Sequence, residues 1–316
     1  MQKGNFLPEG TLIDTDENKR NTATVAALKY AMDNNITLEG RVCLCDAAHN
    51  LIVKMGRFVG IVPRSDAALG IDEGMVREIA VISRVGKPIA VKVKKVEIAP
   101  AGELTLILSR KAAQEETLDY LLHNLKQGDV IPARITHLES FGAFVDIGCG
   151  NISLIGIENI SVSRISHPRD RFYIGQEIYA AVLCVNKEEK RITLTHRELL
   201  GTWQENAELF EPGQTVRGVV RGIEEYGVFV ELAPNLSGLA EKKDGLKEGD
   251  EVSVFIKNIA YDRMKIKLII IDVLHDIDDD RYNIYYFKKE GRIERWNYCP
   301  ENCLKKNIYT DFDETR

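Results

Sequence analysis

The chain changes its hydrophobic period near residue 38. Before that point, Val25, Leu28 and Met32 lie at a spacing that places them on one face of a helix. From Leu38 onward, short runs alternate apolar and polar residues and are separated by glycines and polar turns, which is typical of β-strands. The pattern therefore predicts a helical beginning followed by a mainly β protein.

Three segments repeat one hairpin pattern. In each, a glycine and then a polar pair or Lys-Pro precede an alternating strand, a short link and a second strand. The first strands of these hairpins read VGKPIAVKVKKV, IGQEIYAAVLCV and EGDEVSVFIKNI. A matching first half precedes each hairpin, so the chain repeats one small all-β module three times. Five short strands in about 70 residues suit a closed barrel, because closure removes exposed sheet edges. We expect three tandem five-stranded barrels joined by short helical connectors.

The repeat predicts where the units begin and end. In order, the expected units are an N-terminal helical extension (1–37), a degenerate first barrel (38–111), a helical connector (112–126), a second barrel (127–198), a second helical connector (199–211), a third, shortened barrel (212–272) and a C-terminal extension (273–316). Trp203 lies at helical spacing with Leu199 and Phe210, which favours core packing over stacking on a nucleobase. Alternation in the last unit predicts a hairpin across Lys289-Glu290-Gly291.

Two stretches place an aromatic residue, a glycine, a small residue and a second aromatic residue in that order: SFGAFVDIG at 140–148 and EYGVFVEL at 225–232. In the first, Ala143, Val145 and Ile147 form one face, which we assign to the barrel core, so Phe144 and Asp146 face outward. An exposed aromatic in mid-strand needs a reason, since burial would stabilise it by roughly 1.5–3 kcal/mol.

A bend at the glycine would explain both aromatics. We expect Gly142 to turn Phe141 to the same outer face as Phe144, and Gly227 to do the same for Tyr226 and Phe229. Two rings side by side on the outside of a barrel form a platform on which unpaired bases stack. Either ring alone is also compatible with packing in the core or against a neighbouring unit.

The composition of the chain limits the kinds of binding partner and compartment that we expect for it. The net charge of −6 argues against coating duplex DNA, but it leaves open a local basic groove with stacking aromatics. Six cysteines scattered over 316 residues do not resemble a disulfide framework. No window approaches the ~20 apolar residues of a membrane span, and the amino terminus does not resemble a secretory signal. We expect a cytoplasmic protein.

Over roughly residues 38–272 the chain resembles the S1 RNA-binding domain, an OB-fold repeat of bacterial ribosomal protein S1 and of several RNA-processing enzymes. The motifs are FGAFVDIG, IENIS at 157–161 where the family often reads LVHIS, and the closing GQEI…KRITL. In that family the two aromatics, a histidine in LVHIS and polar or basic residues of the last hairpin form the RNA face. The resemblance implies these RNA-binding residues: Phe141, Phe144, Asn159, Asn186 and Arg191 in the second unit, and Tyr226, Phe229 and Lys265 in the third.

The other two units depart from this pattern to different degrees. In the third unit, Glu241 takes the histidine position and would repel phosphate. The first unit lacks the aromatic pair and more closely resembles the leading repeats of ribosomal protein S1, which resemble protein-docking modules. We therefore expect the second unit to be the main RNA reader.

Three further groups of residues have two readings each. Arg164, His167, Arg169 and Arg171 form either a phosphate-contacting rim beside the second unit's face or a solvated loop. Cys299 and Cys303 are either metal ligands or a structural or incidental pair, and the second reading is favoured because the two further ligands that tetrahedral zinc requires are missing. The acidic run DIDDD at 276–280 is compatible with Mg²⁺ binding in a nuclease, but an acidic surface turn is the simpler reading.

These observations favour non-catalytic binding of single-stranded RNA. The resemblance implies a role in translation, with messenger RNA as the partner and the small ribosomal subunit as a further partner. We expect no catalytic residue, metal, cofactor, membrane contact or small-molecule substrate. The alternative is a protein-docking adaptor or RNA-linked regulator of gene expression, and a metal-dependent nuclease is the third reading.

Overall fold

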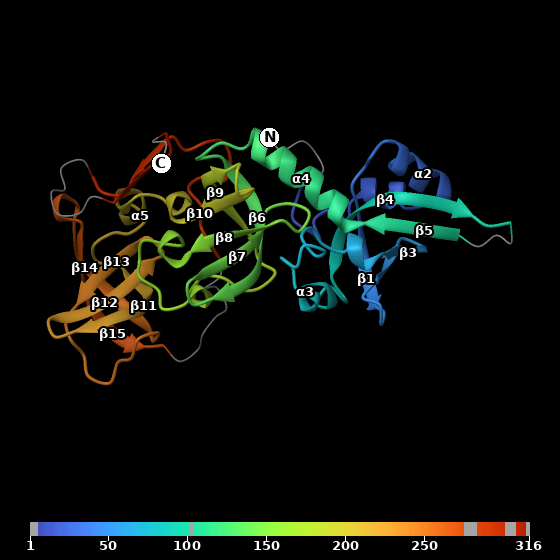
Figure 1. Ribbon diagram of the computed structural model, residues 1–316. Helices are drawn as coiled ribbons and strands as arrows, with labels where there is room; N and C mark the ends of the chain where they lie inside the picture. The colour runs from blue at the N-terminus through green and yellow to red at the C-terminus, as the bar shows by residue number, and fades with distance from the viewer. Residues whose placement is uncertain (1–5, 101–103, 275–282, 301–307, 314–316) are drawn as a thin grey trace.

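Three closed five-stranded barrels lie in a row (Figure 1). The computed structural model describes residues 6–100, 104–274, 283–300 and 308–313. The strand orders are β1-β2-β3-β5-β4, β10-β8-β7-β6-β9 and β11-β12-β13-β15-β14. In every barrel the third strand pairs in parallel with the fifth, which closes the sheet without a free edge. The predicted fold class of three small β-barrels is confirmed.

The first barrel follows two short helices and is joined to the second by a longer one. These elements are α1 (Asp16–Asn21), α2 (Val25–Asp33), β1 (Leu38–Cys45), β2 (Leu51–Met55), β3 (Phe58–Val62), η1 (Arg64–Asp66), α3 (Glu78–Ile82), β4 (Pro88–Ile98), β5 (Leu104–Ser109) and α4 (Arg110–Asn124). The helix α4 begins where β5 ends, with the Ser109 side chain accepting a hydrogen bond from the Ala112 amide as its N-cap. Figure 1 shows α4 bridging the first and second barrels.

The second barrel carries two short 3₁₀ turns before its fourth strand, and two more short helical segments follow it. Its elements are β6 (Val130–Glu139), β7 (Gly142–Asp146), β8 (Ile152–Gly156), η2 (Ile157–Asn159), η3 (Pro168–Asp170), β9 (Glu177–Asn186), β10 (Arg191–Thr195), η4 (Arg197–Leu200) and α5 (Trp203–Ala207).

The third barrel has a shorter connection at the corresponding place, and residues 241–250, all described, contain no helix. Its elements are β11 (Thr215–Glu224), β12 (Gly227–Ala233), β13 (Leu236–Ala240), β14 (Glu251–Ala260), η5 (Tyr261–Arg263) and β15 (Lys265–Val273).

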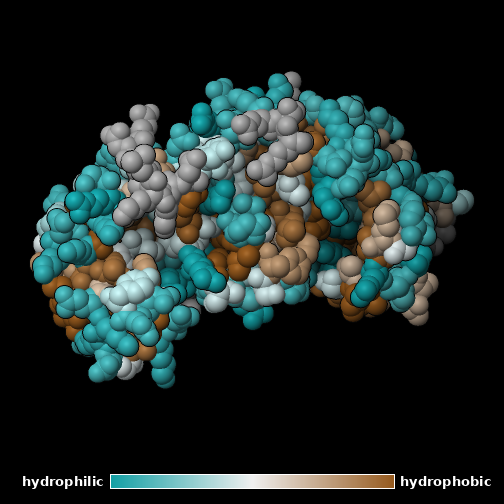
Figure 2. All heavy atoms as spheres, turned by 60° about the vertical axis from the view of Figure 1, so that its left-hand side comes forward, coloured by the Kyte–Doolittle hydropathy of each residue, from teal (hydrophilic) through white to brown (hydrophobic). Residues whose placement is uncertain are grey.

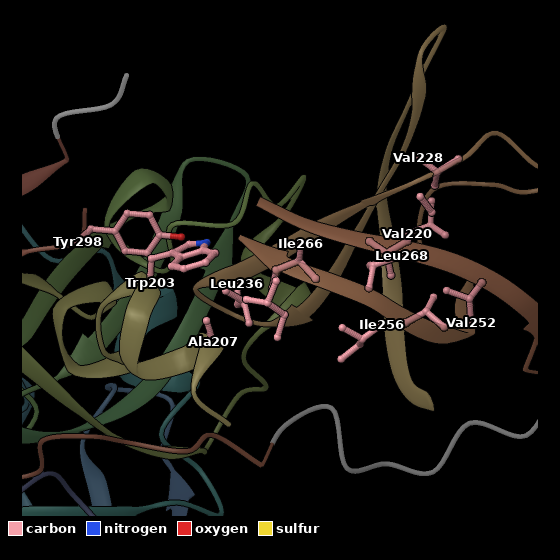
Figure 3. Packing of buried hydrophobic residues seen from close by; sticks show 14 of the residues in the cluster. Trp203, Ala207, Val220, Val228, Leu236, Val252, Ile256, Ile266, Leu268 and Tyr298 are labelled. Carbon is pink, nitrogen blue, oxygen red and sulfur yellow. The ribbon is translucent and has the colours of Figure 1, made fainter. Parts of the chain in front are cut away.

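Each barrel has its own core, built from the inward side chains of alternating strands. Ala143, Val145 and Ile147 are buried, as the alternation predicts. Trp203 is 2% exposed and packs with the third barrel, so it is a core residue. Figure 3 shows it beside Tyr298, at the end of the aliphatic core of that barrel.

Asp146 departs from the expectation that it is exposed, because it is buried where the first and second barrels meet. It accepts hydrogen bonds from the amides of Glu9, Gly148 and Gly150. Glu9 in turn holds Arg110 through both carboxylate oxygens, at 2.7 and 3.0 Å. Burial and the nearby Glu9 charge raise the pKa of Asp146, while these hydrogen bonds and Arg110 oppose that change.

The second and third barrels meet around a second buried ion cluster. Glu231 on β12 accepts from Arg171 at 2.5 Å and from Arg221 at 3.1 and 3.3 Å. Asn235 crosses the same interface: its Oδ1 accepts from the Val162 amide, and its amide group donates to the carbonyls of Arg197 and Gly201. The two barrels are therefore fixed to one another by buried polar contacts.

The C-terminal extension forms hydrogen bonds with both barrels at the junction of the second and third barrels. The Tyr286 hydroxyl contacts both His196 Nε2 and the Tyr179 amide, and the Tyr298 hydroxyl donates to the Asn235 carbonyl at 2.7 Å. The predicted hairpin across Lys289-Glu290-Gly291 is wrong. The extension's paired strands are instead β16 (Arg295–Asn297) and β17 (Tyr309–Asp311), because residues 283–294 run along the barrels and bond to them.

Among the described residues, no helix has both the length and the apolar character that crossing a bilayer requires. Figure 2 shows hydrophobic and hydrophilic residues mixed along one side of the row of barrels.

Candidate nucleic-acid interface

The two aromatic pairs have nearly the same geometry. Phe141 and Phe144 lie edge to face with their ring centroids 5.9 Å apart and their planes at 88°. Tyr226 and Phe229 lie 6.1 Å apart at 89°. In each pair the first ring is exposed, by 55% for Phe141 and 70% for Tyr226, and the second is half-buried. Edge-to-face contact holds the two rings of a pair against each other on the outside of a barrel.

In the second barrel, a bend at the glycine is not what brings the rings together. Phe141 is not part of a strand; it lies in the turn between β6 and β7, and Gly142 is the first residue of β7. A Cβ at Gly142 would stand 2.4 Å from the Ile155 carbonyl oxygen, so the glycine lets β8 approach closely. The irregularity in strand register lies on the partner strand β6, between Ile135 and His137.

Strand pairing extends the platform across the whole face of the second barrel. His137 pairs with Phe144, Phe144 with Leu154, Leu154 with Thr193, and Thr193 with Cys184. All five side chains point away from the core, since their strand neighbours fill it. The His137 ring lies 6.3 Å from that of Phe144, so it extends the platform, although the sequence pattern gave it no role.

The polar residues expected in the second barrel lie along the same face or at its edge. Arg191 and Asn186 form the pair that follows Thr193 and Cys184 in the register, and the Arg191 side chain is 72% exposed. Asn186 also closes the turn between β9 and β10, since its Oδ1 accepts from the Glu189 amide. Asn159 ends η2 after β8, is half-buried, and donates to the Glu158 carboxylate at 3.3 Å.

Residues 124–197, which span this barrel, match the family model of the S1 RNA binding domain. The second barrel is an S1 domain. The chain is 31% identical over 267 residues to small ribosomal subunit protein bS1 of Staphylococcus aureus (strain COL), covering 79% of this chain and 65% of that protein. It is 31% identical over 211 residues to bS1 of Leuconostoc lactis, covering 61% and 49%. The chain thus matches less than two thirds of the length of these curated relatives.

Among solved structures, GSP13 from Bacillus subtilis is 26% identical, with a TM-score of 0.23, and the match covers 23% of this chain and 57% of that one.

The third barrel repeats the face of the S1 domain with more positive charge. Its outward row runs Gly222, Phe229, Leu239, Lys267 and Asn258. Lys265, the expected basic residue, is exposed two positions before Lys267. Lys267 takes the place of Thr193 of the S1 domain. Sequence reasoning missed it, because only the parallel pairing of β13 with β15 places it beside the aromatic row.

The position of Glu241 needs correction. Leu239 pairs with Phe229 as Leu154 pairs with Phe144 in the S1 domain, so Glu241 corresponds to Gly156 and not to Asn159. Its charge therefore does not stand at the histidine position of the motif. Glu241 is exposed directly after β13, two residues beyond Leu239, so its charge lies at the Tyr226 end of the aromatic pair.

The first barrel carries aliphatic residues at the same places. Its outward row runs Leu44, Ile52, Ile61, Ile107 and Lys95. Leu44 is 55% exposed and Ile61 is 40% exposed. This face has the strand geometry of the S1 domain but no ring for a base to stack on.

The expected basic rim is divided by the structure. Arg171 does not fit a phosphate-contacting role, because it is 4% exposed and is bound to Glu231. Arg164 and Arg169 are exposed, while His167 is half-buried and caps η3 by accepting from the Arg169 amide. Beyond its own barrel, this loop makes its contacts with the third barrel.

Two expected groups lie wholly or partly beyond the described ranges. The acidic run 276–280 and Cys303 are outside the described residues, and Cys299 is half-buried. Within the ranges that are described, no three His, Cys, Asp or Glu side chains are grouped so as to hold a metal ion.

Proposed function

We propose that the chain binds single-stranded RNA through the outward faces of its second and third barrels. The observation that carries the proposal is the edge-to-face ring pair, which recurs with matching distance and angle in both barrels. Base–aromatic stacking contributes about 1–3 kcal/mol per base and is tolerant of sequence. A face without rings, as in the first barrel, offers no such contact.

Within this proposal the residues divide into stacking and phosphate-contacting groups. Phe141, Phe144, Tyr226 and Phe229 stack on bases, and Asn159 and Asn186 are hydrogen-bonding residues at the edge of the S1 domain. The exposed positive charges of Arg191, Lys265 and Lys267 attract the phosphate backbone of the RNA. The S1 domain has the larger platform, because His137 adjoins its rings, whereas the third barrel has Gly222 at that position.

The biological setting that we propose is translation. The relatives that the chain resembles over most of its length are named as small ribosomal subunit proteins. Messenger RNA and the small ribosomal subunit are then the proposed partners, and the cytoplasm is the proposed location.

The test is the affinity for a fluorescently labelled unstructured RNA at moderate salt. Replacing one stacking ring in Phe144→Ala is expected to weaken binding about 5- to 150-fold, the equivalent of one stacked base. Phe141→Ala/Phe144→Ala is expected to lose more. Tyr30→Ala is the matched control, because Tyr30 is 59% exposed on α2 and lies on no barrel face. Equal affinity of the double variant and the wild type would refute the assignment to the S1 domain.

The aliphatic row of the first barrel favours a second function, the docking of a protein. Exposed Leu44, Val59 and Ile61 form apolar surface around Ile52, which takes the place of Phe144 and Phe229 in the other barrels. Co-sedimentation with ribosomes that survives RNase treatment would support docking, and its loss would favour attachment through RNA alone.

A further inference from the structure

We propose that the loop 161–171 of the S1 domain and the aromatic face of the third barrel form one composite site for single-stranded RNA. This inference rests on the proposed function and deepens it. Arg164 and Arg169 hold phosphates of the same RNA segment whose bases stack on Tyr226 and Phe229. The second barrel thus supplies part of the third barrel's binding site.

Three side-chain contacts anchor the loop to the outward side of the third barrel. Arg171 binds Glu231 at 2.5 Å, and the Ser163 and Ser237 hydroxyls are 2.9 Å apart. Asp170 lies 3.7 Å from Arg221. The Ser163 amide also donates to the Pro234 carbonyl, so backbone as well as side chains fix the loop. Figure 1 shows the chain between β8 and β9 lying against the strands of the third barrel.

These anchors stand next to the aromatic row. On β12, Phe229 and Glu231 are two residues apart and share the outward side, and on β13 the same holds for Leu239 and Ser237. Phe229 pairs with Leu239, and Glu231 pairs with Ser237. The anchored row is therefore about 7 Å from the aromatic row, at ~3.4 Å per residue.

The exposed arginines of the loop adjoin its anchored residues. Arg164 follows Ser163, and Arg169 precedes Asp170. Neither guanidinium forms a hydrogen bond or ion pair with any residue that the structure describes, whereas Arg171 is committed to Glu231. A free guanidinium keeps five donors and a permanent charge for phosphate oxygens.

The basic groups lie beside Phe229 of the third barrel. Lys267 pairs with Leu239 in the parallel register of β13 with β15, which places Lys265 level with Ser237. Arg164 and Arg169 adjoin the loop residues that cover Glu231 and Ser237, on the same side of the aromatic row as Lys265. A strand whose bases stack on Tyr226 and Phe229 therefore meets positive charge beyond Phe229.

The junction of the first and second barrels lacks this arrangement. The corresponding loop of the first barrel exposes apolar residues, among them Met75, Ile79 and Ile82. Of its arginines, Arg84 is bound to Glu9 and largely buried, Arg64 is paired with Glu78, and Arg77 is exposed. A loop with two exposed arginines beside an aromatic pair is therefore found at the second junction.

The experiment measures the affinity of the full chain for fluorescein-labelled oligouridine over a salt series. Arg164→Ala/Arg169→Ala is made in the wild type, in Tyr226→Ala/Phe229→Ala and in Phe141→Ala/Phe144→Ala. Lys19→Ala/Lys29→Ala removes the same charge from exposed sites on α1 and α2 and is the control. We expect the arginine pair to reduce the slope of log affinity against log salt by about 0.7 for each lost phosphate contact. We also expect its loss of affinity to shrink in the Tyr226/Phe229 background and to persist in the Phe141/Phe144 background.

The outcomes separate this inference from the proposed function. A slope equal to that of the lysine control, or a loss that shrinks only in the Phe141/Phe144 background, overturns the composite site while leaving RNA binding intact. Failure of the wild type to bind, or indifference of binding to both aromatic pairs, overturns the proposed function itself.

Discussion

The buried cluster around Glu231 allows a sharp test of how the second and third barrels are joined. One carboxylate faces two guanidinium groups, from Arg171 on the second barrel and Arg221 on the third. The side chains of Arg171 and Glu231 are only 5% and 6% exposed. Removing the carboxylate alone, in Glu231→Gln, leaves two positive charges that repel each other, with Asp170 at 3.7 Å from Arg221 as the remaining nearby acid. Breaking a buried pair in this way costs about 3–5 kcal/mol.

Removing one arginine is expected to cost less. In Arg171→Met, Glu231 keeps both bonds to Arg221, at 3.1 and 3.3 Å. The loss is then at most the ~1.5–3 kcal/mol of a hydrogen bond between charged groups. The net loss of stability is smaller than this, because the variant no longer bears the desolvation cost of burying the Arg171 charge. The Arg171 Nε also has no hydrogen-bond partner among the described residues, which further limits what the arginine contributes.

Urea unfolding followed by tryptophan fluorescence measures these free energies, because Trp203 and Trp296 both pack in the third barrel's core cluster. We expect Glu231→Gln to lower the free energy of unfolding more than Arg171→Met. The double variant should be more stable than Glu231→Gln alone, since it removes the repulsion. Glu224→Gln, at an exposed position on β11, should stay within about 0.5 kcal/mol of wild type. A double variant less stable than Glu231→Gln would refute the reasoning.

Two further predictions concern single side chains. Gly142→Ala is expected to destabilise by about 1–3 kcal/mol in thermal or urea unfolding, because its Cβ would meet the Ile155 carbonyl oxygen at 2.4 Å. Gly222→Ala, whose Cβ meets nothing closer than 3.9 Å, should stay within about 0.5 kcal/mol, and equal costs would contradict the close-approach argument. Burial lowers the pKa of His196 from 6.5 to about 4, so as the pH falls the unfolded chain takes up a proton that the folded chain does not. The stability of wild type relative to His196→Gln should therefore fall by roughly 3 kcal/mol between about pH 7 and about pH 4, and a difference independent of pH would contradict this assignment.

The sequence was sufficient for features that depend on local periodicity. Alternation along 143–147 assigned Ala143 and Val145 to the core, and the repeated hairpins gave three barrels of five strands. The spacing of Trp203 with its helical neighbours placed it correctly in a core. These features follow from which residues neighbour each other along one strand or helix.

Features that depend on pairing between distant strands could not be read from the sequence. His137 and Lys267 join the aromatic rows only through the register of β6 with β7 and of β13 with β15. The burial of Asp146 and Arg171 depends on how one barrel meets the next. Alternation shows that such a side chain leaves its own core, but not whether another barrel covers it.

The burial of Asp146 and Glu231 follows from one structural rule. Each lies two residues after the half-buried ring of its barrel, so strand alternation puts the acid and the ring on the same outward side. In both barrels the acid is buried at the junction with the preceding barrel, near Arg110 in one case and against Arg171 in the other. In the first barrel the same position is Lys54, which is exposed. The side of the barrel that carries the rings is thus also the side that joins the preceding unit. A change at a junction acid should therefore alter the setting of the adjacent rings as well as stability, which links the affinity measurements to the unfolding measurements at Glu231.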